Sequence, residues 1–124
     1  MSHRILIIED EQALAEAMKE FMESIGYEVD CAAEREEAEA LLAHYPYSLV
    51  ITDLALSPLG LAGVDILDNL ADQAKRPRVI VYSGHADPEL GSHLGAHGVD
   101  AFLQKPQPLG EVAKLATRLL ECGS

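Results

Sequence analysis

The sequence contains little cysteine and no long apolar run. Its two cysteines, Cys31 and Cys122, lie far apart and form no Cys-x-x-Cys motif, so we expect no disulfide framework and a reducing compartment. The apolar residues fall in short blocks, and none approaches the roughly 20 residues that a membrane-spanning helix needs. Only four residues precede the first apolar block at Ile5, which leaves no room for a secretory signal. These absences predict a cytoplasmic protein without a membrane segment.

Basic residues are also scarce. Nine Lys and Arg residues face 21 Asp and Glu residues, for a net charge of −12. This balance argues against direct binding to nucleic acid or to an anionic membrane, since both require a positive surface. The absence of a Gly-x-x-x-x-Gly-Lys-[Ser/Thr] loop excludes a P-loop nucleotidase. A hydrophobic fraction of 48% over 124 residues is sufficient for one domain over residues 1–124, with a core over about residues 4–120.

Apolar blocks typical of buried strands alternate with apolar residues at helical spacing. The blocks predict strands over residues 5–8, 49–52, 79–82 and 101–103, and the alternation of apolar and polar residues over 27–31 predicts a less buried strand. The helical patterns cover residues 14–25, 33–44, 63–74, 88–97 and 112–120, and Gly26 gives a C-cap signal after the first of them. Five strands that alternate with five helices predict an α/β fold, a parallel sheet with helices on both faces.

Residues with reactive side chains follow four of the five predicted strands. Glu9 and Asp10 follow the first, Asp53 the third, Ser83 the fourth, and Lys105 comes just after the fifth. In such folds the ligand site lies beyond the carboxyl ends of the strands, where the strand order reverses. We therefore expect three acids, one hydroxyl and one lysine to converge on one edge of the sheet.

This set of side chains has a definite chemistry. Three neighbouring carboxylates raise one another's pKa, and a hard divalent cation such as Mg²⁺ relieves the conflict. The cation and Lys105 would together neutralise the oxygens of a phosphoryl group. Asp53 beside them can act as the nucleophile and form an aspartyl-phosphate, and Ser83 can offer its hydroxyl to a phosphoryl oxygen.

These residues resemble the receiver domains of two-component response regulators. The resemblance covers the chain from Arg4 to about Leu120. Asp53 is thirty residues before Ser83, which is twenty-two before Lys105, and the ordered set is more specific than any one motif. The resemblance rests on five features: Glu9-Asp10, Asp53 after an apolar strand, Ser83-Gly84, Lys105-Pro106 and the preceding Phe102.

The resemblance implies a phosphoacceptor and a metal site. Asp53 would accept a phosphoryl group from a histidine kinase or a histidine phosphotransfer protein. Asp10, Asp53 and the backbone carbonyl of Ala55 would bind Mg²⁺, for which Mn²⁺ can substitute, and Glu9 would act directly or through water. Such a protein is not a conventional enzyme, because it catalyses only its own phosphorylation and dephosphorylation.

The resemblance further implies a switch on a flavodoxin-like (βα)5 fold with strand order 2-1-3-4-5. Ser83 and Lys105 would grip the phosphoryl group, and the bond before Pro106 would be cis. Phe102 would swing inward as Ser83 moves toward the phosphate. The altered surface around the fourth helix, fifth strand and fifth helix would signal to a downstream protein or to an output domain outside this chain.

Other interpretations remain open for single residues and for the whole chain. Glu9 and Asp10 could simply form a solvated strand end, with Asp10 capping the next helix. Phe102 could be an ordinary residue of the hydrophobic core. A haloacid-dehalogenase-type hydrolase would need a second acid where Ala55 stands. A receiver-like scaffold that binds proteins without phosphorylation is the main alternative, because the loop after Asp53 is about two residues longer than is usual in relatives.

Overall fold

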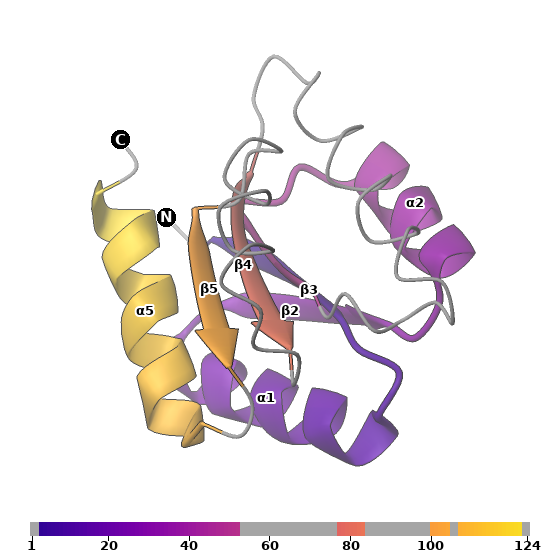
Figure 1. The fold of residues 1–124 in the computed structure, drawn as a ribbon. Coiled ribbons are helices and arrows are strands. Elements are labelled where there is room, and N and C mark those ends of the chain that lie inside the picture. Colours follow the sequence, from indigo (N-terminus) through magenta and orange to yellow (C-terminus); the bar gives the residue numbers. More distant parts are fainter. Residues whose placement is uncertain (1–2, 53–76, 84–99, 105–106, 123–124) are drawn as a thin grey trace.

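The computed structural model describes residues 3–52, 77–83, 100–104 and 107–122 of the chain. The predicted helices over residues 63–74 and 88–97 lie outside these ranges. The described elements follow one another in the predicted order (Figure 1). They are β1 (Arg4–Ile8), α1 (Gln12–Ile25), β2 (Glu28–Ala32), α2 (Arg35–His44), β3 (Leu49–Thr52), β4 (Arg78–Ser83), β5 (Ala101–Gln104) and α5 (Leu109–Cys122).

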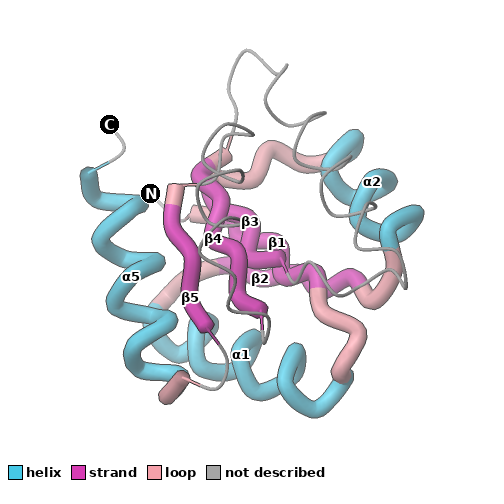
Figure 2. The backbone as a smooth tube through the Cα atoms, in the orientation of Figure 1, coloured by secondary structure: helices cyan, strands magenta, loops and turns pink. Residues whose placement is uncertain are grey.

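The five strands form one parallel sheet with the order β2-β1-β3-β4-β5, as the resemblance implied (Figure 2). The register places Ile8 of β1 beside Thr52 of β3, and Thr52 beside Val81 of β4. At the other side of the sheet from β2, Ser83 of β4 pairs with Gln104 of the outer strand β5. All four pairings are parallel, so the carboxyl ends of the strands meet at one edge of the sheet.

The sheet separates two apolar layers. Helices α1 and α5 cover one face and α2 lies on the other (Figure 1). Side chains alternate between the faces along each strand, so Ile5 and Ile7 pack toward α1 and α5 whereas Leu6 and Ile8 pack toward α2. Side chains on both faces of the inner strands are therefore buried, and this explains why these strands are continuous apolar runs.

Burial along the strands follows their place in the sheet. Residues Ile5–Ile8 of β1 and Leu49–Thr52 of β3 are all buried, as expected of inner strands covered on both faces. Strand β2 is an edge strand in which only Val29 and Ala32 are buried, which confirms the less buried strand predicted there. Cys31 in β2 is a free, half-buried cysteine.

Helix ends follow local signals. Gly26 ends α1 in the left-handed conformation at φ 116°, and the N–H groups of Gly26 and Tyr27 donate to the carbonyls of Glu23 and Met22 at 3.0 and 3.3 Å. Helix α5 begins at Leu109, three residues before the predicted start at Val112. Within the described part of the chain, no helix combines the length and the apolar character that crossing a bilayer requires.

Candidate functional site

The strand order identifies one edge of the sheet as the expected ligand site. Strand β1 lies between β2 and β3. The chain adds β2 on one side of β1 and then β3, β4 and β5 on the other side, so the strand order reverses at β1. Ligands of open parallel sheets bind at this reversal, beyond the carboxyl ends of the strands. Here the last pair of β1 and β3 is Ile8 with Thr52, and the next residues in sequence are Glu9 and Asp53.

Glu9 and Asp10 occupy this edge with different exposures. Glu9 is 4% exposed, and its N–H donates to the carbonyl of Ala32 at 2.9 Å, which extends the pairing with β2. Its carboxylate oxygen Oε1 accepts a hydrogen bond from the N–H of Glu11 at 3.2 Å. Asp10 is exposed. The first carboxylate is thus fixed in the turn between β1 and α1, and the second reaches solvent beside it.

The alternative role of Asp10 as a helix cap is wrong. The N-cap position of α1 belongs to Glu11, which makes no side-chain capping hydrogen bond. Asp10 lies one residue earlier, at a bend between the strand and the helix. Asp10 therefore follows the carboxyl end of β1 without occupying the cap position of α1.

The donor chemistry at this edge suits a hard divalent cation. Glu9 and Asp10 supply carboxylate oxygens from adjacent residues, the ligand type that Mg²⁺ prefers. Among the residues described, no three His, Cys, Asp or Glu side chains gather as a metal site. The third expected carboxylate, Asp53, lies outside the described residues together with Ala55, so the described pair is a fitting but partial ligand set.

A buried hydroxyl next to the expected phosphoacceptor was not anticipated from the sequence. Thr52, the last residue of β3, is 1% exposed, and its Oγ1 has no hydrogen-bond partner among the described residues. Unpaired buried polar groups are uncommon and often accompany functional sites. The only sequence signal was a hydroxyl at the end of an otherwise aliphatic strand.

The fourth and fifth strands bring further predicted residues to the same edge. Ser83 ends β4 and pairs with Gln104 at the end of β5, while Lys105 and Pro106 lie outside the described residues. Phe102 is half-buried and packs against the core cluster on the α2 face. This contact agrees with a core role for Phe102 and leaves its role as a switch untested.

Sequence analysis placed Tyr82 only at the end of a strand, yet its side chain makes a specific contact. The Tyr82 hydroxyl accepts a hydrogen bond from the N–H of Gln107 at 3.0 Å and lies 3.3 Å from the carbonyl oxygen of the same residue. Gln107 belongs to the connection between β5 and α5. The available signal was a tyrosine in a buried aliphatic strand, since a buried phenol normally finds a polar partner.

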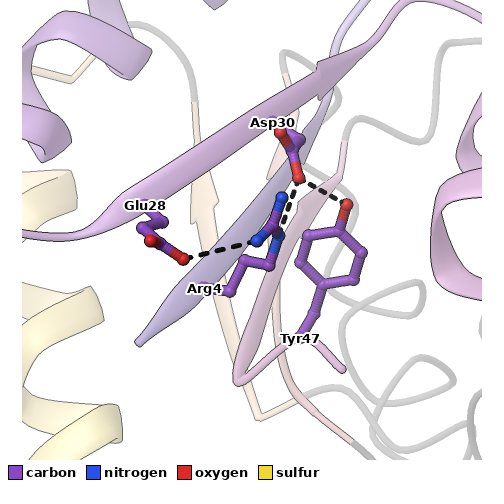
Figure 3. Close-up of polar contacts among 4 residues, drawn as sticks. All are labelled: Arg4, Glu28, Asp30 and Tyr47. Atoms are coloured by element: carbon purple, nitrogen blue, oxygen red, sulfur yellow. Dashed lines mark hydrogen bonds and ion pairs between the residues drawn. The ribbon is translucent and has the colours of Figure 1, made fainter. Parts of the chain in front are cut away.

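A second polar cluster lies at the opposite, amino-terminal edge of the sheet (Figure 3). The guanidinium of Arg4 donates to Asp30 at 3.0 Å and to Glu28 at 3.3 Å, and it lies 4.1 Å from the ring centre of Tyr45. The Tyr47 hydroxyl donates to the same Asp30 oxygen at 2.7 Å. Burial and this hydrogen bond raise the pKa of Tyr47 well above its usual value. These contacts join the starts of β1, β2 and β3, so we assign the cluster to stability.

Comparison with known proteins identifies the family. Residues 5–117 match the sequence model of the response regulator receiver domain, which covers most of the chain. The chain belongs to the receiver domain family of response regulators. The alternative of a receiver-like scaffold that binds proteins without phosphorylation is not favoured.

Curated relatives support the assignment over almost the whole receiver domain. The chain is 33% identical over 122 residues to the response regulator GtcR of Aneurinibacillus migulanus, which covers 96% of this chain and 48% of that protein. It is 34% identical over 113 residues to the transcriptional regulatory protein QseB of Escherichia coli O157:H7, covering 89% of this chain and 49% of QseB. The receiver domain thus spans about half the length of these relatives.

Solved structures agree with the fold. A CheY-like response regulator receiver domain protein from Methanospirillum hungatei JF-1 superimposes with a TM-score of 0.89 at 26% identity, over 98% of this chain and 95% of that one. Phosphorylation and dependence on Mg²⁺ are general features of receiver domains, and such a domain implies a histidine kinase or a phosphotransfer protein as partner.

Proposed function

We propose that this receiver domain accepts a phosphoryl group on Asp53 from a histidine kinase or a histidine phosphotransfer protein. One observation carries the proposal: at the reversal of strand order, Glu9 and Asp10 directly follow β1, whose last residue Ile8 pairs with Thr52, the residue before Asp53. The order of the sheet thus brings the acidic pair and the end of β3 to one edge. The proposal covers residues 1–124 as one domain, acting in the cytoplasm.

In this proposal the acidic pair helps to hold Mg²⁺. Asp10 and Asp53 bind the ion through their side chains, Ala55 through its backbone carbonyl, and Glu9 directly or through water. The buried position of Glu9 and its bond to the Glu11 N–H support a fixed carboxylate at the site. The bound ion would shield the negative charges of the phosphoryl oxygens as they approach the carboxylates.

The transfer step is a displacement at phosphorus. An oxygen of the Asp53 carboxylate forms the new bond to phosphorus, and the bond to the donor breaks; with acetyl phosphate, acetate leaves with the bonding electrons. The ammonium of Lys105 contacts the phosphoryl oxygens and offsets their charge. Ser83 donates its hydroxyl to one phosphoryl oxygen. The pairing of Ser83 with Gln104, the residue before Lys105, supports a shared role for the two.

Phosphorylation would then alter the surface that partners contact. A phosphoryl group adds about −1.5 to −2 charges and three acceptor oxygens. Movement of Ser83 toward it would open space for Phe102, whose ring already lies against the core cluster on the α2 face. The altered surface would act on a downstream protein or on an output domain. An output domain is consistent with relatives that are about twice as long as this chain.

The decisive experiment is intact-mass measurement after incubation with acetyl phosphate and Mg²⁺. We expect one added phosphoryl group in the wild-type chain and none in Asp53→Asn or in samples without Mg²⁺. Beryllofluoride, a stable mimic of the phosphoryl group, is the control for a phosphate that is hydrolysed too quickly to be detected. It should shift the NMR signals of Ser83 and Phe102.

The outcomes separate the phosphoacceptor proposal from the alternative of a receiver-like scaffold. An adduct that requires both Asp53 and Mg²⁺ establishes the switch chemistry. If neither acetyl phosphate nor beryllofluoride acts on the wild-type chain, the phosphoacceptor proposal is wrong, and a role in binding proteins without phosphorylation replaces it.

A further inference from the structure

The Tyr82 hydroxyl holds both backbone polar groups of one residue in the connection between β5 and α5. It accepts a hydrogen bond from the Gln107 N–H at 3.0 Å and donates to the Gln107 carbonyl oxygen at 3.3 Å. Tyr82 is 3% exposed, and its ring belongs to the core cluster beneath α1 and α5. The hydroxyl is therefore held by a buried ring, and a bond to backbone atoms does not depend on the side chain of Gln107.

Gln107 and Gln104 bracket the segment that contains Lys105. Gln104 is the last residue of β5 and pairs with Ser83, the neighbour of Tyr82 in β4. Between Gln104 and Gln107 the chain contains only Lys105 and Pro106. Proline has no N–H, so the N–H of Gln107 is the first backbone donor after Lys105 that can anchor the segment. Two consecutive residues of β4 thus hold both flanks of this short segment.

We propose that Tyr82 is a positioning residue for phosphoryl transfer, which acts by fixing the backbone that follows Lys105. The inference rests on the proposed function, in which the Lys105 ammonium meets the phosphoryl oxygens. A lysine carries its charge on a flexible four-carbon stem, so the placement of its backbone limits where the charge can go. Small errors in the placement of a catalytic group lower the rate strongly.

The contact also couples the two strand ends that the switch uses. Ser83 follows Tyr82 directly, so a displacement of the end of β4 is transmitted to Gln107 through the phenol as well as to Gln104 through the strand pairing. A purely structural contact would stabilise the start of α5 without altering the rate of transfer. The experiment must therefore separate rate from stability.

The test is the variant Tyr82→Phe, which removes one oxygen and keeps the buried ring. We expect phosphorylation by acetyl phosphate to be about three- to tenfold slower, the range expected from the loss of one ordinary hydrogen bond. Mg²⁺ affinity should not change. The matched control is Tyr27→Phe, whose hydroxyl bonds to Thr117 Oγ1 at 3.1 Å beside the same core cluster. This control should phosphorylate at the wild-type rate.

A double-mutant cycle with Lys105→Ala distinguishes positioning from general destabilisation. If Tyr82 acts through Lys105, Tyr82→Phe should cause no further loss of rate in the Lys105→Ala background. An equal slowing in both backgrounds, or a wild-type rate in Tyr82→Phe alone, would overturn the inference and leave Asp53 phosphorylation intact. A wild-type chain that takes up no phosphoryl group would instead remove the proposed function, and this inference with it.

A measurement on the unmodified chain keeps the inference testable if Tyr82→Phe does not fold. The Gln107 amide should exchange its hydrogen slowly in the wild-type protein, because the phenol holds it. Fast exchange at Gln107 within an otherwise protected sheet would show that the contact does not persist, and would overturn the inference.

Discussion

Acidic side chains have two different roles at the two ends of the strands in this sheet. At the carboxyl edge, the Glu9 carboxylate is buried where the expected metal site lies. At the amino edge, the Asp30 carboxylate accepts hydrogen bonds from both Arg4 and the Tyr47 hydroxyl. The Arg4 guanidinium compensates the charge of Asp30 and the neutral Tyr47 phenol adds a hydrogen bond, which is the arrangement of a stabilising contact.

The Tyr47 contact yields a stability prediction. Tyr47→Phe removes the 2.7 Å bond to Asp30 and keeps the ring, so the free energy of unfolding should fall by about 1–2 kcal/mol at pH 7. Urea unfolding measures the change. Tyr45→Phe is the matched control, because the Tyr45 hydroxyl has no hydrogen-bond partner within the described ranges and its ring stays against Arg4. An equal loss in both variants would refute the assignment.

The same contact predicts how stability depends on alkaline pH. The folded state raises the pKa of Tyr47, chiefly by burial and then by the Asp30 bond, so folding favours the neutral phenol. The stabilisation is complete below the pKa of an unfolded tyrosine, about 10, and is lost as pH rises from there toward the folded pKa. Between pH 9 and 11 the wild-type chain should lose more stability than Tyr47→Phe. Parallel pH curves would contradict this.

At the scale of elements, the end of α1 and the start of α5 use glycine differently. Gly26 has φ 116°, a conformation that residues with a side chain rarely adopt, whereas Gly110 lies in the first turn of α5. A methyl group built on either glycine meets no atom within 4 Å. Backbone conformation alone therefore distinguishes the two positions.

This difference predicts opposite effects of the same substitution. Gly26→Ala should lower the free energy of unfolding by about 1 kcal/mol because of strain in the left-handed conformation. Gly110→Ala should raise it by up to about 1 kcal/mol, because alanine loses less backbone entropy in a helix. Thermal and urea unfolding of the two variants provide the comparison. A gain in Gly26→Ala would show that the helix end adapts.

The start of α5 was placed too late by the apolar spacing of the sequence. The apolar spacing of α5 first becomes regular at Val112, but the helix begins at Leu109. The carbonyl of Pro108 accepts hydrogen bonds from the N–H groups of Glu111 and Val112 at 2.9 and 3.4 Å, which forms the first turn. Proline is well suited to helix starts, a signal that apolar spacing does not include.

At the scale of the whole molecule, a net charge of −12 allows a divalent cation to stabilise the fold in two ways, by binding where carboxylates converge and by general screening. If Mg²⁺ binds the folded state at Glu9, Asp10 and Asp53, it must stabilise folding by mass action. The expected gain is about 2.7 kcal/mol at a concentration 100 times the Kd. General screening of acidic charge would give a smaller gain, independent of any one carboxylate.

A pair of neighbouring substitutions distinguishes site binding from screening. Asp10→Asn and Glu11→Gln each remove one exposed negative charge from adjacent positions. We expect Asp10→Asn to abolish most of the Mg²⁺-dependent rise in melting temperature, and Glu11→Gln to retain it. Melting curves at constant ionic strength measure both. Equal responses in the two variants would mean that the ion acts by screening alone.

The fold class, the order of the described elements and the family could all be predicted from the amino-acid sequence alone. Alternating apolar periods are local properties, and the run of Ile5–Ile8 indicates a strand covered on both faces without reference to its neighbours. The ordered acids, hydroxyl and lysine after successive strands were also readable, because parallel strands bring their carboxyl ends to one edge.

The partners of the polar side chains, by contrast, could be identified only from the three-dimensional structure. The hydroxyl of Tyr82 meets Gln107, 25 residues away, and Tyr47 shares Asp30 with Arg4. Such contacts depend on strand register and on the packing of distant segments, about which residue types in sequence carry no signal. Glu9 was recognisable as an acid at a strand end, but its burial and its bond to the Glu11 N–H required the packed sheet and the turn into α1.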